Sequence, residues 1–119
     1  MAAKLGFFEI PANDFERAVK FYTDALGFEI TLCGNETEQM GMIECENTMG
    51  AISKAEGFET SANGTMLTFE VEDIDNTLLK VSKAGGKSYR GKTKIEAEGM
   101  GYFAIFYDTE GNRIGIHSA

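Results

Sequence analysis

The chain has 119 residues, of which 43% are hydrophobic and 25% are charged, as in one ordinary globular domain. Eleven basic and nineteen acidic side chains give a net charge of −8. This charge argues against nucleic acid and anionic membranes as partners, because both need a positive protein surface. No apolar run approaches the roughly 18 residues that cross a bilayer, and the first residues lack a signal-peptide pattern. We therefore expect a cytoplasmic protein.

The first half of the chain predicts a strand, a helix and three further strands. Residues 7–10 form the predicted strand, which ends before a proline. Asn13 is expected to cap the helix, with Glu16 three residues later completing a capping box. Apolar residues follow at helical spacing until Gly27, the type of residue that ends helices. Three strands are expected after it, at residues 28–32, 40–45 and 50–53.

The second half repeats this order. A strand is predicted at residues 65–71, a helix capped by Asp73 and ended by Gly85 and Gly86, and strands at residues 87–89, 101–106 and 113–117. The last two strands are joined by a turn at residues 108–112. Asp108, Gly111 and Asn112 in this turn are expected to be structural.

An internal repeat explains the two similar halves. A shift of 59 residues pairs Asp14 with Asp73 and Gly27 with Gly86, so that two helix starts and two helix ends coincide. The chain is therefore predicted to be one domain made of two copies of a strand, a helix and three strands. We place the first copy at residues 1–56, a linker at 57–63 and the second copy at 64–119.

Two segments are similar to the glyoxalase/bleomycin-resistance/dioxygenase superfamily, also called the vicinal-oxygen-chelate superfamily. The first is residues 8–22 with the Leu-Gly-Phe that ends at Phe28, and the second is residues 101–114. The resemblance covers essentially the whole chain. It implies an α+β fold in which two βαβββ repeats form a curved mixed sheet with helices on the outside. It also implies a cavity on the concave face, usually completed by dimerisation, and hence a homodimer.

The resemblance further implies where a metal would bind. In metal-using members each half supplies two ligands, one from its first and one from its last strand, drawn from His, Glu and sometimes Gln. Counting from the helix caps and from the last turn places those four positions at Phe7, Ser53, Met66 and Gly115. None of these residues is a competent ligand for a hard or borderline divalent cation. We therefore predict no metal cofactor, with an atypical divalent metal site as the alternative.

Two polar residues are expected on the same face as those positions. Glu9 follows Phe7 by two residues and His117 follows Gly115 by two, so that strand alternation gives each pair one direction. A carboxylate and the single imidazole could transfer protons or bind a polar ligand group. The plain alternative is that both side chains only face water. Together with apolar neighbours, the candidate ligand-binding set is Phe7, Glu9, Ser53, Met66, Phe103, Gly115 and His117.

These observations favour a metal-independent protein that binds a neutral or cationic small molecule. The alternative is a glyoxalase-like lyase or isomerase, or a dioxygenase-related enzyme, that uses Glu9 and His117 as catalytic residues in an atypical site. A third possibility is a dimeric protein whose groove accepts another macromolecule. Cys33 and Cys45 show no metal-ligand spacing and are expected to be reduced thiols of unassigned role.

Overall fold

The computed structural model describes residues 2–35 and 37–119. The first half contains β1 (Phe7–Pro11), α1 (Phe15–Leu26), β2 (Ile30–Gly34), β3 (Gln39–Cys45) and β4 (Thr48–Lys54). The second half contains β5 (Leu67–Glu70), α2 (Ile74–Lys83), β6 (Lys87–Lys94), β7 (Tyr102–Tyr107) and β8 (Arg113–Ser118). None of the described helices is long and apolar enough to cross a membrane.

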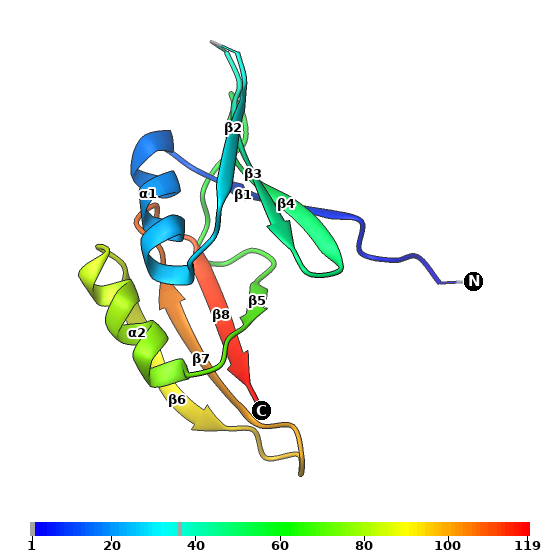
Figure 1. The fold of residues 1–119 in the computed structure, drawn as a ribbon, viewed down its shortest axis with the longest axis vertical. Coiled ribbons are helices and arrows are strands. Elements are labelled where there is room, and N and C mark those ends of the chain that lie inside the picture. The colour runs from blue at the N-terminus through cyan, green and yellow to red at the C-terminus, as the bar shows by residue number, and fades with distance from the viewer. Residues whose placement is uncertain (1, 36) are drawn as a thin grey trace.

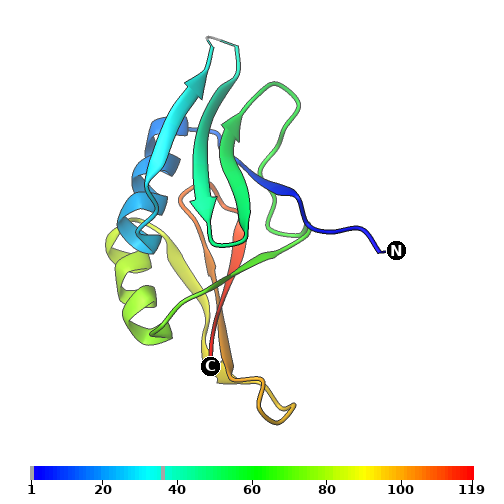
Figure 2. The ribbon, with the colours of Figure 1, turned by 45° about the vertical axis from the view of Figure 1, so that its right-hand side comes forward.

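The strands form two four-stranded mixed sheets of the same topology. Their orders are β1-β4-β3-β2 and β5-β8-β7-β6, with β1 parallel to β4, β5 parallel to β8 and the other pairs antiparallel. This arrangement confirms the predicted α+β fold of two βαβββ modules. Both helices lie on one side of the molecule, and the N-terminal segment extends away on the other (Figures 1 and 2).

The starts of the two helices are equivalent, but the expected capping role of Asn13 is wrong. The cap of α1 is Asp14, whose carboxylate accepts a hydrogen bond from the Arg17 amide, and the cap of α2 is Asp73, which accepts from the Asn76 amide. The amide of Asn13 instead donates to a glutamate of the second module, Glu110. This long-range contact moves the first helix residue one position along the chain, which a local capping pattern does not reveal.

The helix ends differ by one residue from the predicted repeat. Gly27 ends α1 in the left-handed conformation with φ 73°, and the residue in that conformation after α2 is Gly85, with φ 100°. Gly27 therefore corresponds to Gly85 and not to Gly86. α2 is two residues shorter than α1, with 10 residues in place of 12, but Ala84 caps it before Gly85 adopts the left-handed conformation.

Several strand boundaries also differ from the prediction. β2 begins at Ile30 because Phe28 leaves the strand and packs its ring against Phe69, 5.3 Å away between centroids. β5 is shorter than predicted, and β6 extends to Lys94. The residues of β6 are mostly polar, so its full length could not be predicted from apolar alternation. Its Arg90 and Lys92 lie over the rings of Phe103 and Tyr102 on β7, which pairs with it.

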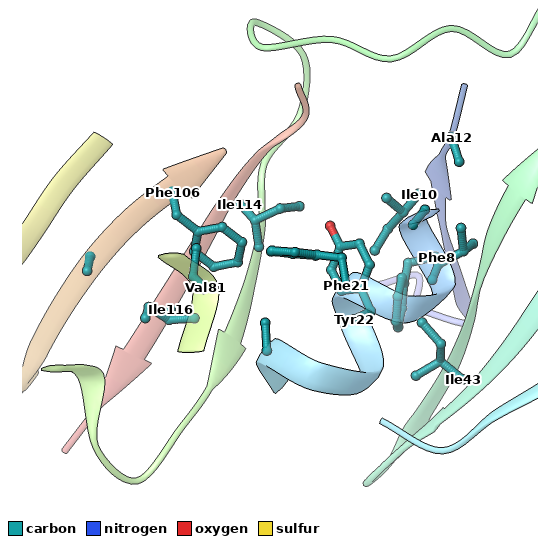
Figure 3. Close-up of a cluster of buried hydrophobic side chains, with 14 of the residues drawn as sticks. Phe8, Ile10, Ala12, Phe21, Tyr22, Ile43, Val81, Phe106, Ile114 and Ile116 are labelled. Carbon is teal, nitrogen blue, oxygen red and sulfur yellow. The ribbon is translucent and has the colours of Figure 1, made fainter. Parts of the chain in front are cut away.

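The hydrophobic core is shared by the two modules, with α1 at its centre. Phe21 and Tyr22 of α1 lie between side chains of the first sheet, such as Ile10, and side chains of the second sheet, such as Phe106 (Figure 3). The rings of Phe21 and Phe106 are 5.9 Å apart between centroids. One face of each sheet therefore packs against the side chains of the helices. The residues on the opposite face of each sheet do not take part in this packing.

Candidate functional site

We call the face of each sheet that points away from its helix the far face. Alternation along the strands and the register between them assign its members. On the first sheet they are Phe7, Glu9, Met40, Met42, Glu44, Met49, Ala51 and Ser53. On the second sheet they are Thr68, Glu70, Phe103, Ile105, Tyr107, Arg113, Gly115 and His117.

The far face of the first sheet combines exposed apolar side chains with one polar contact. Phe7 and Met49 are register partners, and they are 42% and 43% exposed. The hydroxyl of buried Ser53 donates to Oε1 of Glu9 over 3.1 Å. The structure therefore brings two of the predicted site residues, Glu9 and Ser53, into direct contact.

On the second sheet, Met66 lies just before β5 and close to Gly115, which lies in the neighbouring strand β8. A Cβ atom placed on Gly115 would meet Oγ1 of Thr68 at 2.5 Å and Cε of Met66 at 3.3 Å. These side chains therefore cover the backbone of β8 at this point and leave no room for a larger residue. Partly buried Phe103 is the register partner of His117 on β7.

His117 is held by two acceptors. Its Nδ1 lies 2.7 Å from Oε1 of Glu70 and its Nε2 lies 2.5 Å from the carbonyl oxygen of Met100. Only the protonated imidazolium can donate to both at once. The carbonyl of Met100 and then the carboxylate of Glu70 raise the pKa of His117 above its usual value. The protonated imidazole would tie β8 to β5 and to the segment before β7.

The predicted proton-transfer residues have separate partners. Glu9 is bonded to Ser53 in the first module, and His117 is bonded to Glu70 in the second. No hydrogen bond joins Glu9 to His117 in the described chain. Because both ring nitrogens of His117 are occupied by acceptors, the imidazole has no free nitrogen with which to take up a proton in this arrangement.

The four positions that the family resemblance gives to metal ligands do not fit a divalent ion. Phe7 and Gly115 offer no donor atom, Met66 offers a thioether, and the Ser53 hydroxyl is already bonded to Glu9. Among the described residues, no group of three or more His, Cys, Asp or Glu side chains is placed to hold a metal. The donor set therefore gives no basis for deriving a reaction through an ion.

Sequence reasoning missed two charged residues beside the site. Glu70 lies in the predicted strand and shares the alternation of Met66, so that the period of two could have placed it on the far face. Arg90 lies beyond the predicted end of its strand, and its guanidinium lies 5.3 Å from the centre of the Phe103 ring. The polar residues after residue 89 show no alternation that predicts a longer strand.

The turn between β7 and β8 fastens the two modules together. Asp108 accepts hydrogen bonds from the Tyr22 hydroxyl at 2.6 Å, from the amides of Glu110 and Asn112, and from the Asn112 side chain. Burial raises the pKa of Asp108 although these donors act in the opposite direction, and burial together with Asp108 raises the pKa of Tyr22 well above its usual value. The predicted structural role of this turn agrees with these contacts.

Glu110 in the same turn completes the fastening. Its carboxylate accepts from the amides of Asn13 and Asp14 and from Nε of Arg17 at 2.7 Å. Burial alone would raise the pKa of Glu110, but the Arg17 guanidinium and the amides outweigh it, so that the pKa is lowered. The two segments that carry the family resemblance therefore meet in space, because one holds the start of α1 and the other holds the Glu110 turn that binds it.

Two βαβββ modules joined in this way define a class of protein with one mixed sheet per module. Residues 4–116 match the model of the Glyoxalase/Bleomycin resistance protein/Dioxygenase superfamily. The chain belongs to this family.

Individual relatives agree with this assignment. A glyoxylase-like domain-containing protein from Didymella fabae is 33% identical over 113 residues, which cover 91% of this chain and 88% of the relative. A glyoxylase/bleomycin resistance protein/dioxygenase domain from Frankia sp. EAN1pec has a similar crystal structure, with a TM-score of 0.78, 15% identity and coverage of 100% of this chain and 99% of that one. The genomically encoded fosfomycin resistance protein FosX from Listeria monocytogenes follows with a TM-score of 0.75, 12% identity and coverage of 100% and 93%. At these identities the solved structures show a common fold.

Proposed function

We propose that the protein binds a small organic molecule on its far faces without a metal ion. The observation that carries this proposal is the exposure of large apolar side chains at the family's ligand positions, 42% for Phe7 and 37% for Met66. Apolar residues with a few polar groups are typical of small-molecule sites. Flexible methionines such as Met40 and Met42 suit an adaptable pocket. A neutral or cationic ligand agrees with Glu9 and Glu44 on the first far face.

Binding is better supported than the alternative of metal-free catalysis. An enzyme that used His117 as its base would need a free imidazole nitrogen, and both nitrogens are engaged by Glu70 and Met100. A bound ligand needs only shape and a few polar contacts. The enzyme reading would regain support if substitution of His117 abolished turnover of a glyoxalase-type substrate.

A second copy of the chain completes the site in this proposal. Residues 1–56 contain ten acidic and four basic side chains, whereas residues 64–119 contain eight acidic and seven basic ones. The far faces differ in the same sense, with Glu9 and Glu44 on the first, and Arg113 as well as Glu70 on the second. A homodimer that places a first module against a second module therefore keeps the two more acidic modules apart and covers the exposed apolar side chains.

Thermal-shift screening against small neutral and cationic compounds tests the binding step. A ligand that binds only the folded state raises the melting temperature, and the Phe7→Ala variant should lose that shift. Dialysis against Zn²⁺ or Mn²⁺ followed by elemental analysis tests metal independence. Stoichiometric retention of either ion, or the lack of a shift with every compound, counts against the proposal.

Sedimentation tests the dimer with a matched pair of variants. Met49→Asp places a charge on the far face and should yield monomers, whereas Leu79→Asp places one on exposed α2 and should leave the dimer intact. A wild-type chain that sediments as a monomer, or two variants with the same effect, would remove the second copy from the proposal.

A further inference from the structure

An apolar pocket lies between the two modules. It has a volume of about 420 Å³ and lies between the start of β1, the end of α1, the turn that joins β3 to β4, and β5. We call it the junction pocket. It touches the far faces at Glu44, Thr68 and Glu70 but contains none of the residues at the family's four ligand positions.

Aromatic rings form one wall of the junction pocket. Phe8, Phe28 and Phe69 all line it, and the ring of Phe69 meets Phe8 at 5.7 Å and Phe28 at 5.3 Å between centroids, both edge to face. Leu26 and Leu67 extend the apolar lining. The faces of aromatic rings attract cations as well as apolar groups. This wall can therefore accept the apolar part of a ligand and also tolerate a positive charge beside it.

The charged residues of the junction pocket all have the same sign. Glu44, Glu46 and Glu70 line it, and no basic side chain does so among the described residues. All three side chains are exposed, and Glu70 is also bonded to His117, so that Glu44 and Glu46 in particular favour a cation at the mouth of the pocket. This acidic rim is set directly against the aromatic wall.

Backbone polar groups also lie at the junction pocket. Thr48 lines the pocket as well, but its hydroxyl oxygen is buried and is not presented to a ligand. β5 is an edge strand that pairs only with β8, and the Val71 amide donates to His117 of β8. Alternation then directs the backbone carbonyls of Thr68 and Glu70 to the free edge, beside the pocket. An ammonium group has three donors that match such acceptors.

We propose that the junction pocket binds a primary organic ammonium ion joined to an apolar or aromatic group. The apolar part lies against Phe28 and Phe69, and the ammonium group is bound by the free carbonyls of β5 and the acidic rim. Glu44 also lies on the far face, but the other residues of this site differ from those proposed for the far-face ligand, and either site can exist without the other.

The two cysteines provide a built-in reporter of occupancy. Cys45 lines the junction pocket, whereas Cys33 is exposed on β2 and lies outside it. The wild-type protein is alkylated with iodoacetamide at mildly alkaline pH, and each thiol is followed by peptide mass spectrometry. The probe is 2-phenylethylammonium, compared with neutral 2-phenylethanol and anionic 3-phenylpropionate. At a probe concentration ten times its dissociation constant, the ammonium should slow Cys45 alkylation about tenfold and leave Cys33 unchanged.

Matched charge variants test the acidic rim. Glu44→Gln/Glu46→Gln should weaken binding of 2-phenylethylammonium about tenfold by calorimetry, since each lost carboxylate removes a nearby attraction of about 0.7 kcal/mol. Glu56→Gln/Glu59→Gln removes the same charge from the loop after β4, outside the pocket, and should change the affinity less than twofold. Calorimetry also reports on binding if Cys45 reacts too slowly to follow.

A substitution in the aromatic wall tests the apolar part of the site. Phe28→Leu should weaken the binding of 2-phenylethylammonium, whereas the far-face variant Phe7→Ala should leave its affinity unchanged. This difference separates the junction pocket from the proposed far-face site. The proposal fails if 2-phenylethylammonium neither protects Cys45 nor gives binding heat. It also fails if 3-phenylpropionate binds as tightly, or if the two charge variants weaken the probe equally.

Discussion

The two faces of the first sheet differ sharply, although adjacent residues build them. Phe8 points towards α1 and is 7% exposed, whereas its neighbour Phe7 points to the far face and is 42% exposed. A Cβ atom placed on Gly50 would meet the Phe8 ring at 2.3 Å, so that the helix side is tightly filled. The comparison teaches that the helix side of this sheet is filled by the core, while its far face leaves large apolar side chains such as Phe7 exposed.

Substitution of the two adjacent phenylalanines tests this difference most strongly. Phe8→Ala should lower the free energy of unfolding by about 4 kcal/mol, because it opens a cavity in the shared core. Phe7→Ala should lower it by less than about 1 kcal/mol in the monomer, as is usual for an exposed position. Urea unfolding of both variants, below the concentration at which chains associate, measures the two values. Equal losses would show that the far face is part of the folding core.

The fastening between the modules should be the next most sensitive region. Asp108→Ala leaves the Tyr22 hydroxyl, the Asn112 side chain and two amides without their acceptor, and should cost about 3 kcal/mol. Tyr22→Phe removes only one of these bonds and should cost about 1 kcal/mol. The same unfolding assay gives both numbers. A loss from Asp108→Ala no larger than that from Tyr22→Phe would mean that water replaces the carboxylate.

Glu110 should contribute less than Asp108 but in a pH-dependent way. Glu110→Gln should lower the free energy of unfolding by about 2 kcal/mol at neutral pH, since Arg17 and the amides of Asn13 and Asp14 lose a charged acceptor. The pKa of Glu110 is lowered in the folded state. Its stabilisation is therefore present above the unfolded pKa of about 4.5 and is lost as the pH falls through the folded value.

Unfolding measured across the acidic range checks the sign of this effect. The difference between wild type and Glu110→Gln should shrink as the pH is lowered, because protonation makes the wild-type side chain resemble the amide. Arg17→Gln is the companion variant, and it should reduce the same pH dependence. A difference that stays constant or grows in acid would contradict the lowered pKa.

The fold could be predicted from the sequence because its signals are local or repeated. Asp14 and Asp73 cap helices through their own first turns, and Gly27 ends α1 through its left-handed conformation. The errors arose where a distant residue decided the outcome. Glu110 binds the amides of Asn13 and Asp14 from the other module, and Phe28 leaves its strand to meet Phe69.

The candidate site was only partly accessible to sequence reasoning. Alternation gave a common direction to Phe7 and Glu9, which the register of β1 with β4 reproduces. The partner of His117 was missed, because pairing β5 with β8 depends on the three-dimensional order of strands and not on spacing along the chain. The junction pocket was missed for the same reason. Its walls come from β1, α1, β5 and the turn between β3 and β4, which are far apart in the sequence.

The smallest expected effect concerns the His117 pair on the second far face. Because the pKa of His117 is raised in the folded state, its contribution to stability is complete below the unfolded pKa of 6.5 and is lost as the pH rises through the folded value. The pair is partly exposed, so the contribution should be small. Proton NMR can follow the titration directly, since the chain has a single histidine.

Two variants separate the acceptors of His117. Glu70→Gln should lower the measured pKa of His117 while the Met100 carbonyl still holds the ring, and His117→Gln should remove the stability change near neutral pH. A wild-type pKa at or below 6.5 would mean that the imidazole is not held as a charged donor. It would then have a nitrogen free to accept a proton, and the far face would regain the base that the catalytic alternative requires.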